Sequence, residues 1–172
     1  MTDFWGLNFN YEDFDKLLRK DELDEEPVPL EVFVTDRKYL GLPPLSEVQT
    51  EIAKHITQIY KPHTLVKLHG EEKGMEIYNK YTVNEVIAML GKGSGKDHTS
   101  RISLAYIAYL LHCLRDPLDY YHKAHGVYID LLNLAVNAQQ AQRVFFEPFK
   151  NLLLRSPYFN DVGFEPRVGE VF

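Results

Sequence analysis

The sequence is poor in cysteine, has no long apolar run and carries no excess of positive charge. Cys113 is the single cysteine in 172 residues, which excludes an internal disulfide framework. The start of the chain lacks the basic region and apolar stretch of a signal peptide, and no apolar run is long enough to cross a bilayer. A net charge of −6 excludes a global positive field that would draw the chain onto nucleic acid, although a local basic patch stays compatible with it.

What is present indicates one globular domain preceded by a short leader. Hydrophobic residues make up 45% of the chain and charged residues 26%, which is ordinary for a packed domain of this length. Residues 1–28 form the leader, in which aromatic residues precede the acidic run 21–26. We read the run as a solvated linker or helix end, the alternative being an arm that docks on a neighbouring subunit. Residues 29–172 form the domain.

The central feature is a glycine-rich stretch between two regular segments. It contains Gly91, Gly93 and Gly95 and ends at Lys96. Glycines let the backbone curl so that its N–H groups point at an anion, and the helix that follows adds its partial positive end. Lys96 can reach a terminal phosphate. The stretch therefore predicts a phosphate-binding loop.

The fit to the pattern G-x-x-x-x-G-K-[S/T] is partial. Gly95 and Lys96 match, whereas the first glycine falls on Leu90 and the magnesium-binding hydroxyl falls on Asp97. An aspartate oxygen suits Mg²⁺, and Thr99 and Ser100 are nearby hydroxyls that could substitute for it. The alternative is a purely structural glycine turn beside an unrelated lysine.

The surrounding pattern predicts an α/β fold, with a P-loop NTPase-type parallel sheet flanked by helices. We expect strands at 84–90 and 127–136 and a short one at 30–35. We expect helices from Ser46 to Pro62, at 96–114 and from Asn137. Residues 63–83 and the tail from 156 show no strong element. The unit from 85 to 136 would be a right-handed βαβ crossover with its ligand at the carboxyl ends of the strands.

Gln49 has two interpretations. Ser46 and Gln49 have the spacing of a capping box, which would fix the helix start. A glutamine upstream of a phosphate loop can also read the edge of adenine, because its amide both donates and accepts. Both interpretations stay open on the sequence alone.

Three runs taken together resemble a known family. They are 42–49 (LPPLSEVQ), 90–97 (LGKGSGKD) and 134–141 (LAVNAQQA), followed by 144–146 (VFF) and 156–159 (SPYF). In this order they resemble the N-terminal ATPase domain of the large terminase subunit of tailed phages, the motor that pumps DNA into a procapsid. The resemblance covers about residues 30–160.

The resemblance implies an ATP and Mg²⁺ site. Lys92 would replace a basic residue that senses phosphate or couples hydrolysis to movement, and Lys96 would hold the β- and γ-phosphates. Asp97 or Thr99 would lie near the metal, and Gln49 near adenine. The implied nucleotide-binding residues are Gln49, Gly91, Gly93, Ser94, Gly95, Lys96, Asp97, His98 and Thr99.

Other parts of such a motor are missing from the sequence. It needs a second acid for Mg²⁺ and a glutamate that activates water, but no apolar strand ends in paired acids after residue 137. Asp161 and Glu165 are poor candidates in a turn-rich tail, and there is no room for the family's nuclease domain. We therefore expect a fragment that binds nucleotide and hydrolyses it poorly by itself.

By the same resemblance, the expected partners are double-stranded DNA, a portal protein and a small terminase subunit, within a homo-oligomeric ring. The expected location is the cytoplasm of a bacterial host, without a membrane partner. Two alternatives stay open: another P-loop protein, such as a helicase-like ATPase or a nucleotide kinase, and a non-enzymatic interaction module.

Overall fold

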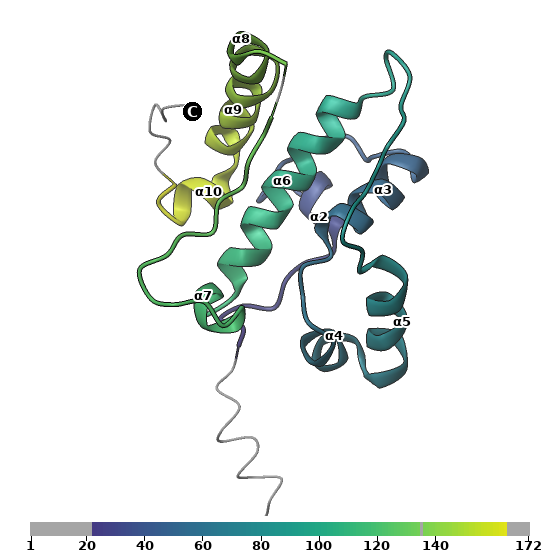
Figure 1. The fold of residues 1–172 in the computed structure, drawn as a ribbon, viewed down its shortest axis with the longest axis vertical. Helices are drawn as coiled ribbons and strands as arrows, with labels where there is room; N and C mark the ends of the chain where they lie inside the picture. The colour runs from purple at the N-terminus through teal and green to yellow at the C-terminus, as the bar shows by residue number, and fades with distance from the viewer. Residues whose placement is uncertain (1–21, 135, 165–172) are drawn as a thin grey trace, which may run out of the picture.

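The computed structural model describes residues 22–134 and 136–164 of the chain, and most of the leader lies outside these ranges. The described part is organised around α6 (Lys96–Cys113), the long helix in the middle of Figure 1. Against α6 pack α2 (Leu30–Thr35), α3 (Glu47–Thr57), α9 (Glu147–Arg155) and the π-helical turn η1 (Ala141–Phe146). The remaining helices are α4 (Pro62–His69), α5 (Glu71–Tyr81), α7 (Pro117–Tyr120), α8 (Ala138–Gln140) and α10 (Pro157–Asp161).

The prediction of a parallel sheet is wrong. Residues 22–134 and 136–164 contain no β-strand, and their one ladder contact is the isolated antiparallel bridge Leu23↔Leu114. The segments expected as strands, 84–90 and 127–134, form no ladder. A strand exists only through hydrogen bonds to a neighbour, and an apolar, β-branched composition does not supply that neighbour. The fold described here is therefore helical.

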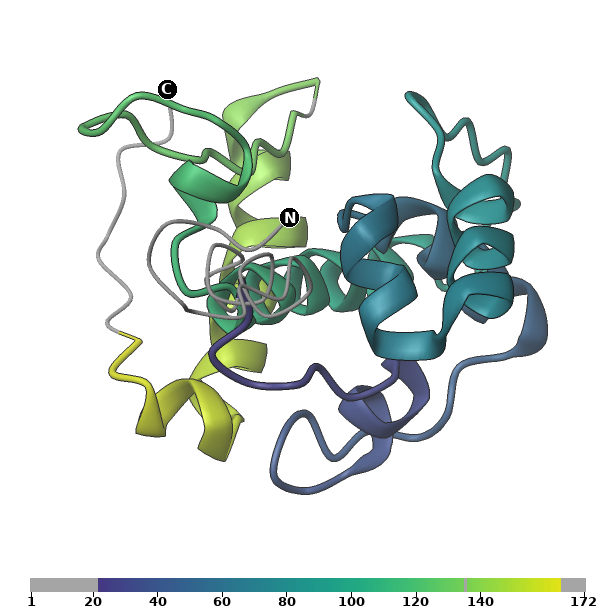
Figure 2. The ribbon, with the colours of Figure 1, turned by 90° about the horizontal axis from the view of Figure 1, so that it is seen from below.

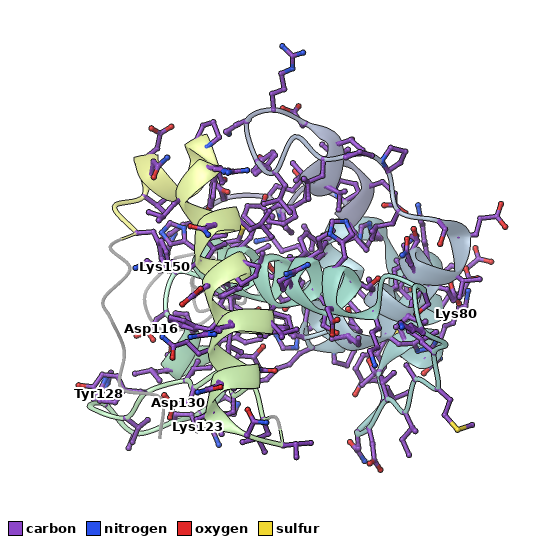
Figure 3. The ribbon with its side chains drawn as sticks, turned by 90° about the horizontal axis from the view of Figure 1, so that it is seen from above. Lys80, Asp116, Lys123, Tyr128, Asp130 and Lys150 are labelled. Atoms are coloured by element: carbon purple, nitrogen blue, oxygen red, sulfur yellow. The ribbon has the colours of Figure 1, made fainter. Side chains whose placement is uncertain are left out.

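The two segments leave an unusual amount of apolar surface in solvent. They lie on either side of α6 in Figure 1 and rise on the same side of the molecule in Figure 2. Met89 is 94% exposed and Leu134 87%. Tyr128 lies at the edge of the molecule, away from α6 (Figure 3). We call 83–89 and the described residues 127–134 and 136 the apolar segments. Their other exposed large side chains are Val83, Val86, Ile87, Val127, Ile129, Leu131, Leu132 and Val136.

Helices replace the elements expected around α3. Residues 30–35 are helix α2 and not a strand, because Leu30, Phe33 and Val34 recur at helical spacing and are all buried. The unassigned region 63–83 forms α4 and α5, and part of the tail forms α10. The helices expected at 46–62 and 96–114 are confirmed as α3 and α6, although α3 ends at Thr57.

The core is largely aromatic. Tyr109 of α6 is fully buried, with its ring 5.0 Å from those of Phe33 in α2 and Tyr158 in α10. Tyr39 and Phe159 join the same cluster. Offset and edge-to-face rings at these separations attract one another beyond their area burial. The cluster therefore fixes α2 and α10 on one side of α6.

Tyrosine hydroxyls also hold the chain that leads into α2. Tyr109 accepts the Val28 N–H at 2.9 Å, and Tyr106 donates to the Val28 carbonyl at 2.7 Å. Further back, the Asp24 N–H donates to the Cys113 carbonyl at 2.8 Å beside the Leu23↔Leu114 bridge. The segment 22–28 is thus attached to α6 at two points.

Within the described residues, no helix combines the length and apolar character that a bilayer crossing requires.

Candidate phosphate-binding site

The glycine-rich stretch forms a compact turn directly before α6. The Ser94 N–H donates to the Gly91 carbonyl at 3.3 Å, which closes the turn. Gly93 and Gly95 have φ of +85° and +77°, a backbone region that side chains with a Cβ adopt only at a cost. Space around Gly91 and Gly93 is open, because no atom lies within 4 Å of the position of an added Cβ. The glycines therefore keep both the turn and the space beside it.

The turn leaves the start of α6 without a side-chain cap. Gly95 occupies the N-cap position and has no side chain to accept hydrogen bonds from the first turn. The N–H groups of the first turn have no acceptor within the helix, and the helix dipole makes this end partly positive. Lys96 and Asp97 are exposed at this end, as is Lys92 in the turn. The arrangement presents donors and two ammonium groups to an anion, with one carboxylate among them.

Gln49 ties this turn to α3. Its side-chain oxygen accepts the Ser46 N–H at 3.0 Å, which completes the capping box. Its amide nitrogen donates to the Ser94 carbonyl at 3.1 Å, across 45 positions of sequence. The capping interpretation is therefore confirmed. Contact with adenine stays a prediction, and it would require the amide to leave partners that it holds in this structure.

The brace between Gln49 and Ser94 was not foreseen from the sequence, although a signal was present. A capping box uses only the oxygen of a glutamine at this position. Its NH₂ group then needs an acceptor of its own, because α3 packs on α6 and Gln49 is half-buried. The NH₂ group of Gln49, in the first turn of α3, therefore indicated a contact with another segment, such as the turn that precedes α6.

The hydroxyls of the site are in different situations. The Ser94 Oγ is buried without a hydrogen-bond partner among the described residues, so it has the capacity for one more bond. Thr99 is buried, and its hydroxyl donates to the Gly95 carbonyl at 3.2 Å. Thr99 thus reinforces the first turn of α6. Its role as a metal ligand stays a prediction.

His98 lies half-buried in the same turn of the helix. Burial lowers its pKa, and the neighbouring Arg101 lowers it further. The imidazole is therefore neutral near pH 7, where it can donate one hydrogen bond without adding charge. Arg101 itself reaches toward η1, where it donates to the Val144 carbonyl at 3.4 Å.

The acids expected for catalysis are not gathered at the turn. Among the described residues, no hydrogen bond or ion pair joins an outside carboxylate to residues 91–99. Asp161 is exposed in α10, and Glu165 lies outside the described residues. Within residues 22–134 and 136–164, no group of three or more His, Cys, Asp and Glu is placed to hold a metal ion. Asp97 stands alone as a carboxylate in the turn.

Comparison with known proteins gives one family. The sequence pattern of the family described as "Uncharacterized protein MJ0330, N-terminal P-loop domain" matches residues 2–170. No curated protein and no solved structure matches the chain. The matched range includes the glycine-rich turn, α6 and the brace from Gln49.

Proposed function

The chain belongs to the family of the MJ0330 N-terminal P-loop domain, and on this premise we propose that its glycine-rich turn binds the phosphates of ATP. The observation that carries the proposal is the turn itself. Gly93 and Gly95 hold a left-handed backbone directly before the uncapped start of an 18-residue helix. This geometry favours an anion, and the family match specifies a P-loop.

The residues present fit a nucleotide with its metal. The unpartnered Ser94 hydroxyl and the first-turn N–H groups supply hydrogen-bond capacity, and Lys96 supplies a charge for the β- and γ-phosphates. Lys92 would contact phosphate from the turn. Asp97, or Thr99 behind it, would stand beside Mg²⁺, which neutralises phosphate charge when it is bound. His98 adds a neutral donor at the same helix end.

Nucleotide titration tests this site directly. Fluorescent ATP would be titrated into the wild-type chain and the Lys96→Ala variant, with Lys150→Ala in α9 as the matched control. Removing one ammonium from a phosphate site costs about 1.5–3 kcal/mol, or roughly 10- to 150-fold in Kd. The control should bind as the wild type does. Equal affinity of wild type and Lys96→Ala would overturn the proposal.

At a finer level, we propose that this P-loop domain acts in a DNA-packaging motor of the terminase type. The support is the order of the sequence runs 42–49, 90–97 and 134–141. The proposed partners are double-stranded DNA, a portal protein and a small terminase subunit, in a ring in the cytoplasm of a bacterial host. ATP turnover would be measured with and without DNA and portal protein. Turnover that neither partner stimulates would reject the motor and leave the nucleotide site standing.

A further inference from the structure

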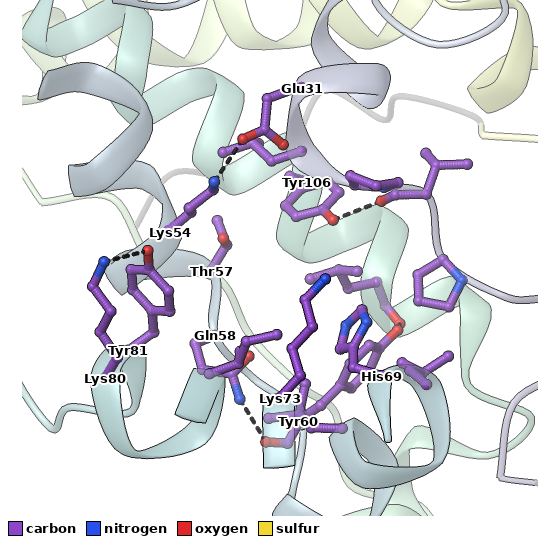
Figure 4. Close-up of a pocket in the computed structure, with 18 of the residues that line it drawn as sticks. Glu31, Lys54, Thr57, Gln58, Tyr60, His69, Lys73, Lys80, Tyr81 and Tyr106 are labelled. Carbon is purple, nitrogen blue, oxygen red and sulfur yellow. Dashed lines mark hydrogen bonds and ion pairs between the residues drawn. The ribbon is translucent and has the colours of Figure 1, made fainter. Parts of the chain in front are cut away.

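A cavity lies away from the glycine-rich turn. It has a volume of about 430 Å³, is open to solvent on one side, and is lined by α3, α4, α5, α6 and the chain that enters α2. None of residues 91–99 lines it. The volume lies in the range of small-molecule sites, which is roughly 300–1,000 Å³. Figure 4 shows the cavity with its lining side chains.

The inner wall of the cavity is apolar. Tyr60, Leu65 and Leu110 are each no more than 5% exposed, and the Tyr106 ring lies beside them. The hydroxyls of both tyrosines are already used, because Tyr60 donates to the Leu110 carbonyl and Tyr106 to that of Val28. This wall therefore offers rings and aliphatic carbons. It suits an apolar body that needs no hydrogen bonds.

Three lysines line the same cavity, and two of them are neutralised. Lys54 pairs with Glu31 at 2.6 Å. Burial raises the pKa of Glu31, but the hydrogen bond and charge of Lys54 together with a backbone hydrogen bond leave that pKa below its usual value. Lys80 pairs with Glu51 at 3.0 Å. Lys73, by contrast, makes no hydrogen bond or ion pair with any residue in the described ranges. Its side chain extends into the cavity beside His69 (Figure 4).

His69 completes the polar end of the cavity. Burial lowers the pKa of His69 first, the charge of Lys73 lowers it further, and Glu26 opposes both effects. The imidazole is therefore neutral near pH 7 and can donate one N–H next to the ammonium of Lys73. Glu26 and Glu76 also line the cavity and disfavour a ligand with several negative charges.

We propose that this cavity binds a small organic monoanion. A single carboxylate would pair with Lys73 and accept a hydrogen bond from His69, and an aromatic or branched body would lie against Tyr60, Leu65 and Tyr106. The carboxylates of Glu26 and Glu76 separate this ligand class from nucleoside triphosphates. The cavity and the phosphate site are therefore independent, and either can fail without the other.

Two probes of equal shape and different charge test the proposal. Indole-3-acetate and the neutral indole-3-acetamide would be titrated at millimolar concentration into the ¹⁵N-labelled full chain, with amide shifts as the readout. Both should move the amides of Thr57, Leu65 and Tyr106. The acetate should bind about fivefold more tightly, the equivalent of about 1 kcal/mol for a partly exposed ion pair.

Variants then identify the cation. Lys73→Met should bring the affinities of the two probes together, whereas Lys150→Met, remote in α9, should keep the fivefold difference. Equal affinities in the wild type, an unchanged difference in Lys73→Met, or no shift with either probe would overturn the proposal. So would shifts confined to the apolar segments. Lys73 is exposed, so its replacement leaves the core intact.

Discussion

The side-chain nitrogen of Gln49 lies 2.6 Å from the position that a Cβ on Gly95 would occupy. Gly95 also has a φ of +77°. The backbone conformation therefore favours glycine at the residue before Lys96, and a side chain there would also force the end of the Gln49 side chain to shift. A methyl group at this position would therefore displace the Gln49 amide that donates to the Ser94 carbonyl.

Gly95→Ala should impair nucleotide binding more than Gly93→Ala. Alanine in the left-handed conformation is strained by about 1–2 kcal/mol at both positions. Only at Gly95 does the new methyl group also contact Gln49. In the double variant Gly95→Ala with Gln49→Ala, part of the lost affinity should return, because the clash is removed and the strain is not. Titration of fluorescent ATP measures the five Kd values, those of the wild type, Gly93→Ala, Gly95→Ala, Gln49→Ala and the double variant. Additive losses would contradict the steric constraint.

Gln49→Ala separates the two roles considered for this residue. If Gln49 acts as the brace on Ser94, the variant should weaken ATP and GTP binding by the same factor, about fivefold for one neutral hydrogen bond. If the amide reads adenine, only ATP should lose affinity. Competition titrations with the two nucleotides give the ratio. We expect the ratio to stay constant.

Gly74→Ala should destabilise the packing of α5 on α4. A Cβ at this buried position would lie 2.6 Å from the Leu65 carbonyl oxygen and the Val66 nitrogen, and neither backbone atom can turn aside. Alanine gains about 1 kcal/mol in helix propensity, but overpacking costs about 1–3 kcal/mol or more, so the net effect is a loss. Urea unfolding measures it. Asn79→Ala, exposed on the same helix, is the control and should be neutral or stabilising.

Stability should fall on mild acidification. Burial lowers the pKa of both His69 and His98, with Lys73 and Arg101 adding to the effect. The unfolded chain therefore binds more protons as the pH drops below about 6.5. The contribution of these histidines is complete above that pH and is lost as the pH falls through their folded pKa values. Urea midpoints would be measured at a series of pH values. The midpoint should fall less steeply with decreasing pH in the double variant His69→Gln, His98→Gln than in the wild type, and an identical pH dependence would refute the prediction.

The apolar segments should limit solubility. Exposed, unpaired apolar stretches of this kind promote association between chains. Leu132→Lys with Leu134→Glu places charges on two residues that are 80% and 87% exposed, so solubility should rise while the thermal midpoint stays the same. Light scattering and calorimetry measure the two quantities. Leu65→Glu, in the core, should instead unfold the chain. A lowered midpoint in the surface variant would show that these side chains are packed.

The sequence predicted the helices that border the site because their signals are local. The capping box at Ser46 and the run from Lys96 to Cys113 need no distant partner to be read. The strands failed for the opposite reason, since Val127–Leu134 has strand composition but a ladder depends on a second segment. In α2, the helical spacing of Leu30, Phe33 and Val34 prevailed over the β-branched residues. The hydrogen bond from Gln49 to Ser94 joins positions 45 residues apart, so local sequence patterns did not predict it either.

The double attachment of residues 22–28 to α6 makes that stretch a spacer of fixed length. Leu23 is paired with Leu114 at one end, and Val28 is held by Tyr106 and Tyr109 at the other. Surface connections usually tolerate an inserted or deleted residue. Here a single deletion between these points would shift α2 along α6 and move Phe33 away from the rings that it contacts. The length of this spacer is therefore more constrained than the identity of its side chains.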